Sequence, residues 1–300
     1  MSDIQKIDEG LFSIDAHMWH PGLASAYVVA GKQVALVETG LSTSAPYILK
    51  GLKDLGFASE DISYIILTHI HLDHAGSAGI LMKEMPRAKV ITHKRGVPHL
   101  VDPTRLLNGA RQALGEKVAG MYNLDKFLPV EAARIDTVED GDSIDLGGRQ
   151  MKAISTPGHA PHHFCFFESQ SRALFTGDLL GTHHSESNVL HPTTPAPDFN
   201  LQVTIDNINQ LKQIDIKTLL FSHFGPSLEV GRLLDLSIKK HTEWGNIVRG
   251  AIADKKDLGY MARSLLEHIR GGIPSRSNAV ELEEAVIYAQ GYVTYFQKNP

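Results

Sequence analysis

Three histidines and one aspartate lie within a stretch of six residues, close enough to share one chemical task. The four side chains belong to His69, His71, Asp73 and His74. They directly follow the apolar run 64–67, which is typical of a buried strand, so we expect them on the loop between that strand and a helix. Imidazole and carboxylate groups are ligands that zinc and similar metals prefer. Capping residues beside solvated histidines are the alternative, but they explain four metal-type side chains at adjacent and alternating positions less well.

Three later segments repeat this arrangement, with a predicted strand that ends beside a metal-type ligand. They lead to His159, Asp178 and His223. Loops at the ends of strands are where α/β enzymes generally assemble their sites. Together with the first four, these residues give seven potential ligands. Seven is too many for one tetrahedral ion but suits two ions that share a carboxylate.

The elements that must position these ligands follow the same order in each half of the chain, with strands first and helices after them. In the first half, the pattern predicts a helix that stops at Gly56, a helix at about 77–85, and strands at 11–14, 24–30, 33–37, 64–67 and 89–91. In the second half it predicts a helix at about 199–214 capped by Asp198, and strands at 134–138, 143–146, 149–155, 162–167, 172–176 and 218–221. Two sheets with helices on their outer faces would form a four-layer αββα sandwich, an α/β fold.

The chain is expected to form one main domain with a helical extension. We assign residues 1–230 to the sandwich, with a helical insertion at about 93–133. In residues 231–300 the pattern predicts helices only, and we expect these helices to pack on the same body. A homodimer contact or one wall of a substrate pocket is the alternative role for their apolar stripe.

Composition narrows the class of protein. With 42% hydrophobic and 21% charged residues, the chain resembles an ordinary globular protein. Its net charge of −5, with both signs scattered, argues against nucleic acid as a partner. We find no apolar run of the ~20 residues that span a bilayer, and no signal peptide at the start. Cys165 is the only cysteine, which excludes an internal disulfide and suggests the cytoplasm.

The run His69-Ile70-His71-Leu72-Asp73-His74 resembles the HxHxDH signature of the metallo-β-lactamase superfamily. The later residues His159, Asp178 and His223 resemble that family's further ligand positions, in order, and the resemblance covers roughly residues 10–225. It implies the αββα fold of the family. It also implies that one metal is held by His69, His71 and His159, that a second is held by Asp73, His74 and His223, and that Asp178 bridges the two. Zinc suits these ligands best, although iron and manganese also suit them.

Details of the motif point to the hydrolytic branches of the superfamily. Asp178 resembles the bridging aspartate of hydroxyacylglutathione hydrolases, lactonases and phosphodiesterases, whereas the β-lactamases often use a cysteine ligand. His71 stands where the diiron flavoproteins tend to have glutamate, which argues against redox chemistry. Glu38 stands where the family commonly has aspartate, and we expect its carboxylate to orient a ligand histidine.

The resemblance implies a hydrolase in which a metal-bridging hydroxide cleaves a small ester, lactone or thioester. Asp73 would steer the proton of that hydroxide, and Asp178 would keep the two ions close. Phosphodiester or phosphotriester cleavage is one alternative, and a metal-bearing, non-enzymatic sensor is another. The substrate would be a small molecule, with no nucleic acid or membrane involved. We expect 93–133 and 181–197 to form the rim of its pocket, with His99 or His191 as candidate contacts.

Overall fold

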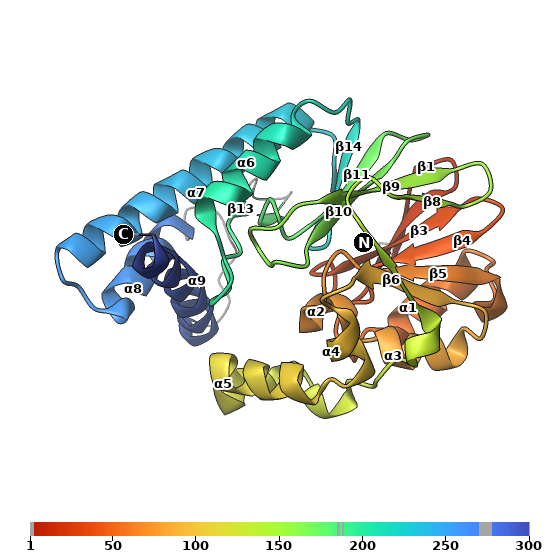
Figure 1. Ribbon diagram of the computed structural model, residues 1–300, viewed down its shortest axis with the longest axis horizontal. Helices are drawn as coiled ribbons and strands as arrows, with labels where there is room; N and C mark the ends of the chain where they lie inside the picture. Colours follow the sequence, from red (N-terminus) through yellow and green to blue (C-terminus); the bar gives the residue numbers. More distant parts are fainter. Residues whose placement is uncertain (1–2, 185–186, 188, 270–277, 300) are drawn as a thin grey trace. The chain divides into compact units, whose positions relative to one another are not determined.

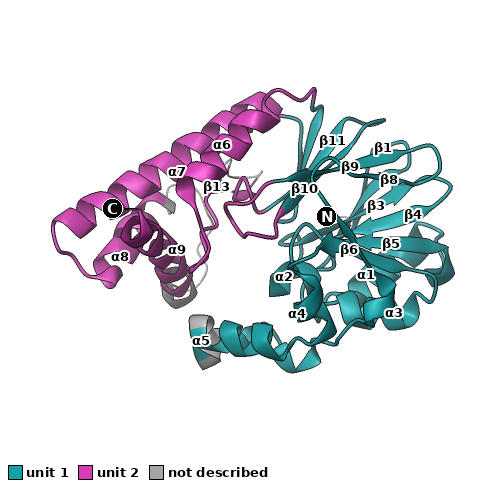
Figure 2. Ribbon diagram, in the orientation of Figure 1, with its two compact units in different colours: residues 1–155, 164–177, 216–228 teal, residues 156–163, 178–215, 229–300 magenta. Residues whose placement is uncertain are grey.

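The computed structural model describes residues 3–184, 187, 189–269 and 278–299. The chain divides into two compact units (Figure 2). Unit 1 comprises residues 1–155, 164–177 and 216–228, and unit 2 comprises 156–163, 178–215 and 229–300. The expected boundary near residue 230 stays a prediction.

Unit 1 contains a sheet of seven strands in sequence order (Figure 1). The strands are β1 (Ile4–Asp8), β2 (Leu11–Asp15), β3 (Ser25–Ala30), β4 (Val34–Val37), β5 (Ile62–Ile66), β6 (Lys89–His93) and β7 (Ile135–Val138). The pairs from β1 to β4 are antiparallel, and the pairs from β4 to β7 are parallel. Parallel neighbours need crossover connections, and these are α1 (Ala45–Asp54) with η1 (Ser59–Asp61), then α2 (Leu72–Ala75) with α3 (Ala78–Glu84).

The last crossover of this sheet is also helical. It contains α4 (Val97–Val101), α5 (Thr104–Met121), η2 (Leu124–Lys126) and η3 (Ala132–Arg134). Gly115 interrupts α5 with a φ of +72°, a left-handed conformation that glycine adopts without a Cβ clash. The segment therefore links β6 to β7 as two short helical arms rather than one straight helix.

A second sheet of six strands completes unit 1. Its strands are β8 (Ser143–Asp145), β9 (Gln150–Ser155), β10 (Phe164–Glu168), β11 (Ala173–Gly177), β14 (Thr218–Phe221) and β15 (Gly225–Ser227). Their spatial order is β15-β14-β11-β10-β9-β8, and β11 with β14 is the parallel pair among antiparallel ones. The carboxyl ends of β11 and β14 therefore lie at the same edge of this sheet.

Side chains from both sheets form one apolar layer between them. Tyr27 and Ile66 from the first sheet share a buried cluster with Phe164, Phe166 and Phe175 from the second. The opposite face of the first sheet is buried too, against α1 and α3. Because strand side chains alternate between faces, a strand buried on both sides must be apolar throughout, as β4 is. The predicted α/β sandwich with C-terminal helices is confirmed.

Unit 2 is mainly helical. Its elements are α6 (Leu201–Leu211), α7 (Val230–Ala253), α8 (Leu258–Ile269), α9 (Asn278–Lys298) and the hairpin of β12 (Thr182–His184) and β13 (Val189–His191). Phe199, Trp244 and Tyr292 lie at the centre of its apolar core. Within the described ranges, we find no helix with the length and apolarity that crossing a membrane requires.

The expected cap of α6 is wrong. The side chain of Asn200, not that of Asp198, accepts a hydrogen bond from the N–H of Val203, at 3.1 Å. Asn200 has an extended backbone (φ −134°, ψ 106°) directly before the first helical residue, which is the conformation that a capping side chain needs.

Candidate metal centre

The loop after β5 carries two of the candidate ligands, and the short helix α2 carries two more. His71 has an extended backbone (φ −61°, ψ 159°) and directly precedes α2, so Asp73 and His74 lie in its single turn. His69 and His74 are both fully buried, and their ring centroids lie 3.9 Å apart. The local sequence thus places four metal-type side chains at the carboxyl end of a central strand.

Asp73, His74 and His223 form one compact donor group within unit 1. Oδ2 of Asp73 lies 3.7 Å from Nε2 of His74 and 3.5 Å from Nε2 of His223. His223 reaches this group because it follows β14 by two residues. One potential ligand atom from each residue lies within 4.8 Å of the other two.

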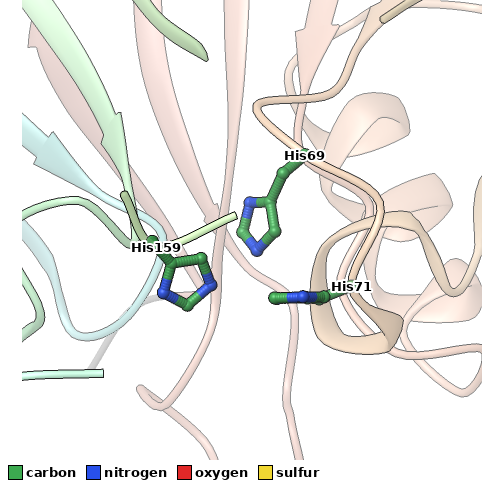
Figure 3. A group of neighbouring side chains, drawn as sticks. All are labelled: His69, His71 and His159. Carbon is green, nitrogen blue, oxygen red and sulfur yellow. The ribbon is translucent and has the colours of Figure 1, made fainter. Parts of the chain in front are cut away.

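His159 and Asp178 follow β9 and β11, and Nε2 of His159 lies 3.7 Å from Oδ2 of Asp178. Figure 3 shows the side chains of three candidate ligands, His69 and His71 of unit 1 and His159 of unit 2. Residues of both units belong to the ligand set that the family resemblance implies. Their role as ligands stays a prediction.

Four of these imidazoles are oriented by an oxygen atom at Nδ1. In His159 the oxygen is the carbonyl of Thr193 at 3.0 Å, and in His223 it is the carbonyl of Leu23 at 3.3 Å. Nδ1 of His74 lies 3.1 Å from a carboxylate oxygen of Glu38, and Nδ1 of His69 lies 3.0 Å from the hydroxyl of Thr68.

This orientation selects the nitrogen that is available to a metal. A carbonyl or carboxylate oxygen can only accept a hydrogen bond, so Nδ1 of His74, His159 and His223 carries the proton. The lone pair of each neutral ring is then on Nε2, the atom that faces the donor groups. Buried imidazoles of this tautomer together with carboxylates suit a divalent metal such as zinc. The donor set therefore fits the group that the sequence predicts.

Glu38 contacts this site through both carboxylate oxygens. Oε2 accepts from His74, and Oε1 accepts from the backbone N–H of Thr68 at 3.3 Å. The residue is buried and has a φ of +67°, an uncommon backbone conformation for a residue other than glycine. Residues with such strained backbone conformations cluster at functional sites.

The two candidate substrate contacts have different surroundings. His191 lies in β13 and is buried, with Nε2 2.6 Å from the hydroxyl of Thr182 and its ring stacked 6.4 Å from that of Trp244. His99 lies in the last turn of α4 and is half-buried. A substrate contact by either residue stays a prediction.

Sequence reasoning missed Thr193, whose carbonyl and hydroxyl both lie beside candidate ligands. Its carbonyl accepts from His159, and its hydroxyl donates to the carbonyl of Asp178 at 3.0 Å. A main-chain contact can be made by any residue type, so the sequence contains no signal for it. The segment 181–197, expected as a pocket rim, thus also supports two candidate ligands.

The sequence of this chain matches one known protein family. The model of the metallo-β-lactamase superfamily matches residues 19–223. The metallo-β-lactamase fold-containing protein ST1585 of Sulfurisphaera tokodaii is 31% identical over 72% of this chain and 78% of its own. The solved structure of ST1585 superposes with a TM-score of 0.70, 24% identity, and coverage of 95% of this chain and 98% of that one.

Two further relatives have names that describe chemistry. The probable metallo-hydrolase YqjP of Bacillus subtilis is 24% identical over 76% of each chain. The atrochrysone carboxyl ACP thioesterase dmxR1 of a Cryptosporiopsis species is 28% identical over 57% of this chain and 42% of its own.

Proposed function

Because the chain belongs to the metallo-β-lactamase superfamily, we propose that it is a metal-dependent hydrolase of small esters, lactones or thioesters. The observation that carries the proposal is the donor set of buried imidazoles with Nε2 turned toward carboxylates. Members of the superfamily are mostly metallo-hydrolases, and the name of YqjP is consistent with that. The thioesterase among the relatives supports an acyl substrate.

The proposal includes two divalent ions, with zinc the best match to the donors. His69, His71 and His159 would hold one ion, Asp73, His74 and His223 the other, and Asp178 would bridge them. When bound, such ions lower the pKa of water toward neutrality and polarise the oxygen of the bond to be cleaved. No serine or cysteine nucleophile is then required.

Asp73 is the candidate for proton handling. Its side chain is 18% exposed, whereas that of His74 is fully buried, so solvent reaches the carboxylate of Asp73. Oδ2 of Asp73 lies 3.7 Å from Nε2 of His74 and 3.5 Å from Nε2 of His223, so one ion could bind all three atoms. Asp178 is buried, and its carboxylate would keep the two ions close.

Charge supports a small substrate over a polyanion. The chain has a net charge of −5, and an overall negative potential repels nucleic acids and other polyphosphates. We therefore propose a small-molecule substrate that is neutral or weakly charged, with no nucleic-acid or membrane partner.

The test combines metal analysis with a substrate panel. Protein purified without chelators is assayed for metal, then for cleavage of aryl esters, lactones, thioesters and bis-aryl phosphates. We expect about two ions per chain and hydrolysis of at least one acyl class. Asp73→Asn and Asp178→Asn should each lower kcat/KM by a factor on the order of 10²–10⁴, while the exposed Asp254→Asn should not change it. Protein that contains no metal, or that cleaves the phosphates alone, contradicts the proposal.

A further inference from the structure

The backbone N–H of Asp178 donates a hydrogen bond to a histidine that is not among the candidate ligands. The acceptor is Nε2 of His163, at 3.1 Å. Both residues are buried, with 1% of His163 and 5% of Asp178 exposed. The ring of His163 also packs edge-on against that of His159, with centroids 5.9 Å apart. One side chain therefore contacts two candidate ligands of unit 2.

The bond fixes the tautomer of His163. A backbone N–H can only donate, so Nε2 must carry a lone pair, and the neutral ring holds its proton on Nδ1. Nδ1 lies 2.9 Å from the hydroxyl oxygen of Thr156 and donates to it. Thr156 is itself fixed, because its backbone N–H donates to the carbonyl of His163 at 3.0 Å. The ring is thus oriented at both nitrogens.

The carbonyl side of Asp178 is fixed as well. The hydroxyl of Thr193 and the backbone N–H of Gly181 both donate to that carbonyl, each at 3.0 Å. The turn that follows is anchored at Leu180, whose carbonyl accepts from the hydroxyl of Ser237 in α7 at 2.9 Å. The backbone carbonyl of Asp178 thus accepts two hydrogen bonds, and His163 accepts the one hydrogen bond that its backbone N–H donates.

We infer that His163 is a positioning residue for Asp178. By accepting the N–H of Asp178, it sets the plane of the preceding peptide and hence the direction in which the carboxylate leaves the backbone. This inference rests on the proposed function, because it assumes that Asp178 is a metal ligand. Partners that orient ligands typically change metal affinity about 10–100-fold when they are removed, and a bridging carboxylate tolerates little misplacement.

The experiment compares two substitutions in the full chain loaded with cobalt(II), whose visible absorption reports the geometry of its ligands. His163→Leu removes the acceptor, whereas His163→Gln keeps an amide oxygen that can accept the same N–H. We expect His163→Leu to lower cobalt affinity about 10–100-fold and to change the visible spectrum. His163→Gln should stay close to the parent chain in both measurements. His268→Leu, at an exposed histidine of α8, is the matched control.

Each outcome decides the inference. If His163→Leu binds cobalt with unchanged affinity and spectrum, the inference is overturned. If that variant does not fold, Thr156→Val replaces it, since this change keeps the imidazole and removes the hydroxyl that orients it. A spectrum unchanged in Thr156→Val then overturns the inference. A parent chain that binds metal and cleaves no substrate contradicts the proposed function alone, because the cobalt measurements do not depend on turnover.

Discussion

Oε2 of Glu38 lies 3.1 Å from Nδ1 of His74, and both side chains are buried. The second oxygen of the same carboxylate accepts from the N–H of Thr68, next to His69. Glu38 therefore connects the end of β4 to both ends of the loop that carries the first four candidate ligands. A carboxylate in this position orients the ring of His74 and makes its Nε2 a stronger donor.

We predict that Glu38→Gln weakens metal binding. The amide preserves the shape of the side chain but removes the charge that holds the Nδ1 proton of His74, so affinity should fall about 10–100-fold. Competition with a coloured zinc chelator measures the change, and the exposed Glu131→Gln serves as the control. Equal zinc affinities in Glu38→Gln and the parent chain would count against this role of Glu38.

Metal removal should lower thermal stability. The candidate ligands Asp73, His74 and His223 are far apart in the sequence and come together only when unit 1 is folded. A ligand that binds only the folded state at 100 times its Kd adds about 2.7 kcal/mol. Calorimetry with a chelator should therefore give a lower Tm than calorimetry with added zinc. In His69→Ala this difference should shrink, and a difference of the same size in that variant would show that zinc acts elsewhere.

Arg134 should stabilise unit 1 through main-chain carbonyls. Its guanidinium donates to the carbonyls of Met82 and Ala88, each at 2.7 Å, and to that of Met85 at 2.5 Å. Arg134→Met leaves these acceptors without the charged donor, at a cost of about 1–3 kcal/mol. Urea unfolding measures the loss. The exposed Arg87→Met is the control, and an equal effect of the two substitutions would refute this account.

His241 should make stability depend on pH. Burial is the main reason that its pKa falls from 6.5 to about 4, although Nδ1 donates to the carbonyl of Ser237. Between these two values the unfolded chain binds a proton that the folded chain does not, so stability falls as pH decreases through that window. The loss attributable to His241 is at most about 3 kcal/mol.

The measurement is a set of urea midpoints for metal-free protein at pH 7.5, 6 and 4.5. The parent chain should lose more stability over this range than His241→Leu, whereas His268→Leu should behave like the parent. A parallel pH dependence in the parent and His241→Leu would show that other groups cause it.

Side-chain chemistry made the candidate ligands predictable, because seven histidine and aspartate residues follow recognisable apolar strands. The same runs predicted most strands of both sheets, since strands buried on two faces must be apolar. The pattern missed β1, whose residues alternate weakly as expected of an edge strand. It also missed the short edge strand β15 and both strands of the β12–β13 hairpin. Short and partly polar strands owe their stability to pairing rather than to composition.

The supporting contacts could not be predicted from the sequence for a different reason. The partners of His159 and His223 are the carbonyls of Thr193 and Leu23, groups that every residue has. The cap of α6 illustrates the same limit, since Asp198 and Asn200 are both good capping residues and the chain path alone selects between them. The residue types that can bind a metal are recognisable in a sequence, but the orientation of their side chains is determined by the tertiary fold.

The contact between His223 and Leu23 joins residues 200 positions apart in the chain. A ribosome releases Leu23 early and His223 late, so most strands of both sheets are synthesised before the ring that donates to the carbonyl of Leu23 is present. Contacts of such separation form slowly, because the loop between them must close first. The donor group of Asp73, His74 and His223 is therefore completed only after nearly all of unit 1 has been synthesised. Uptake of the ion that Asp73, His74 and His223 would hold would therefore report that the folding of this unit is nearly complete.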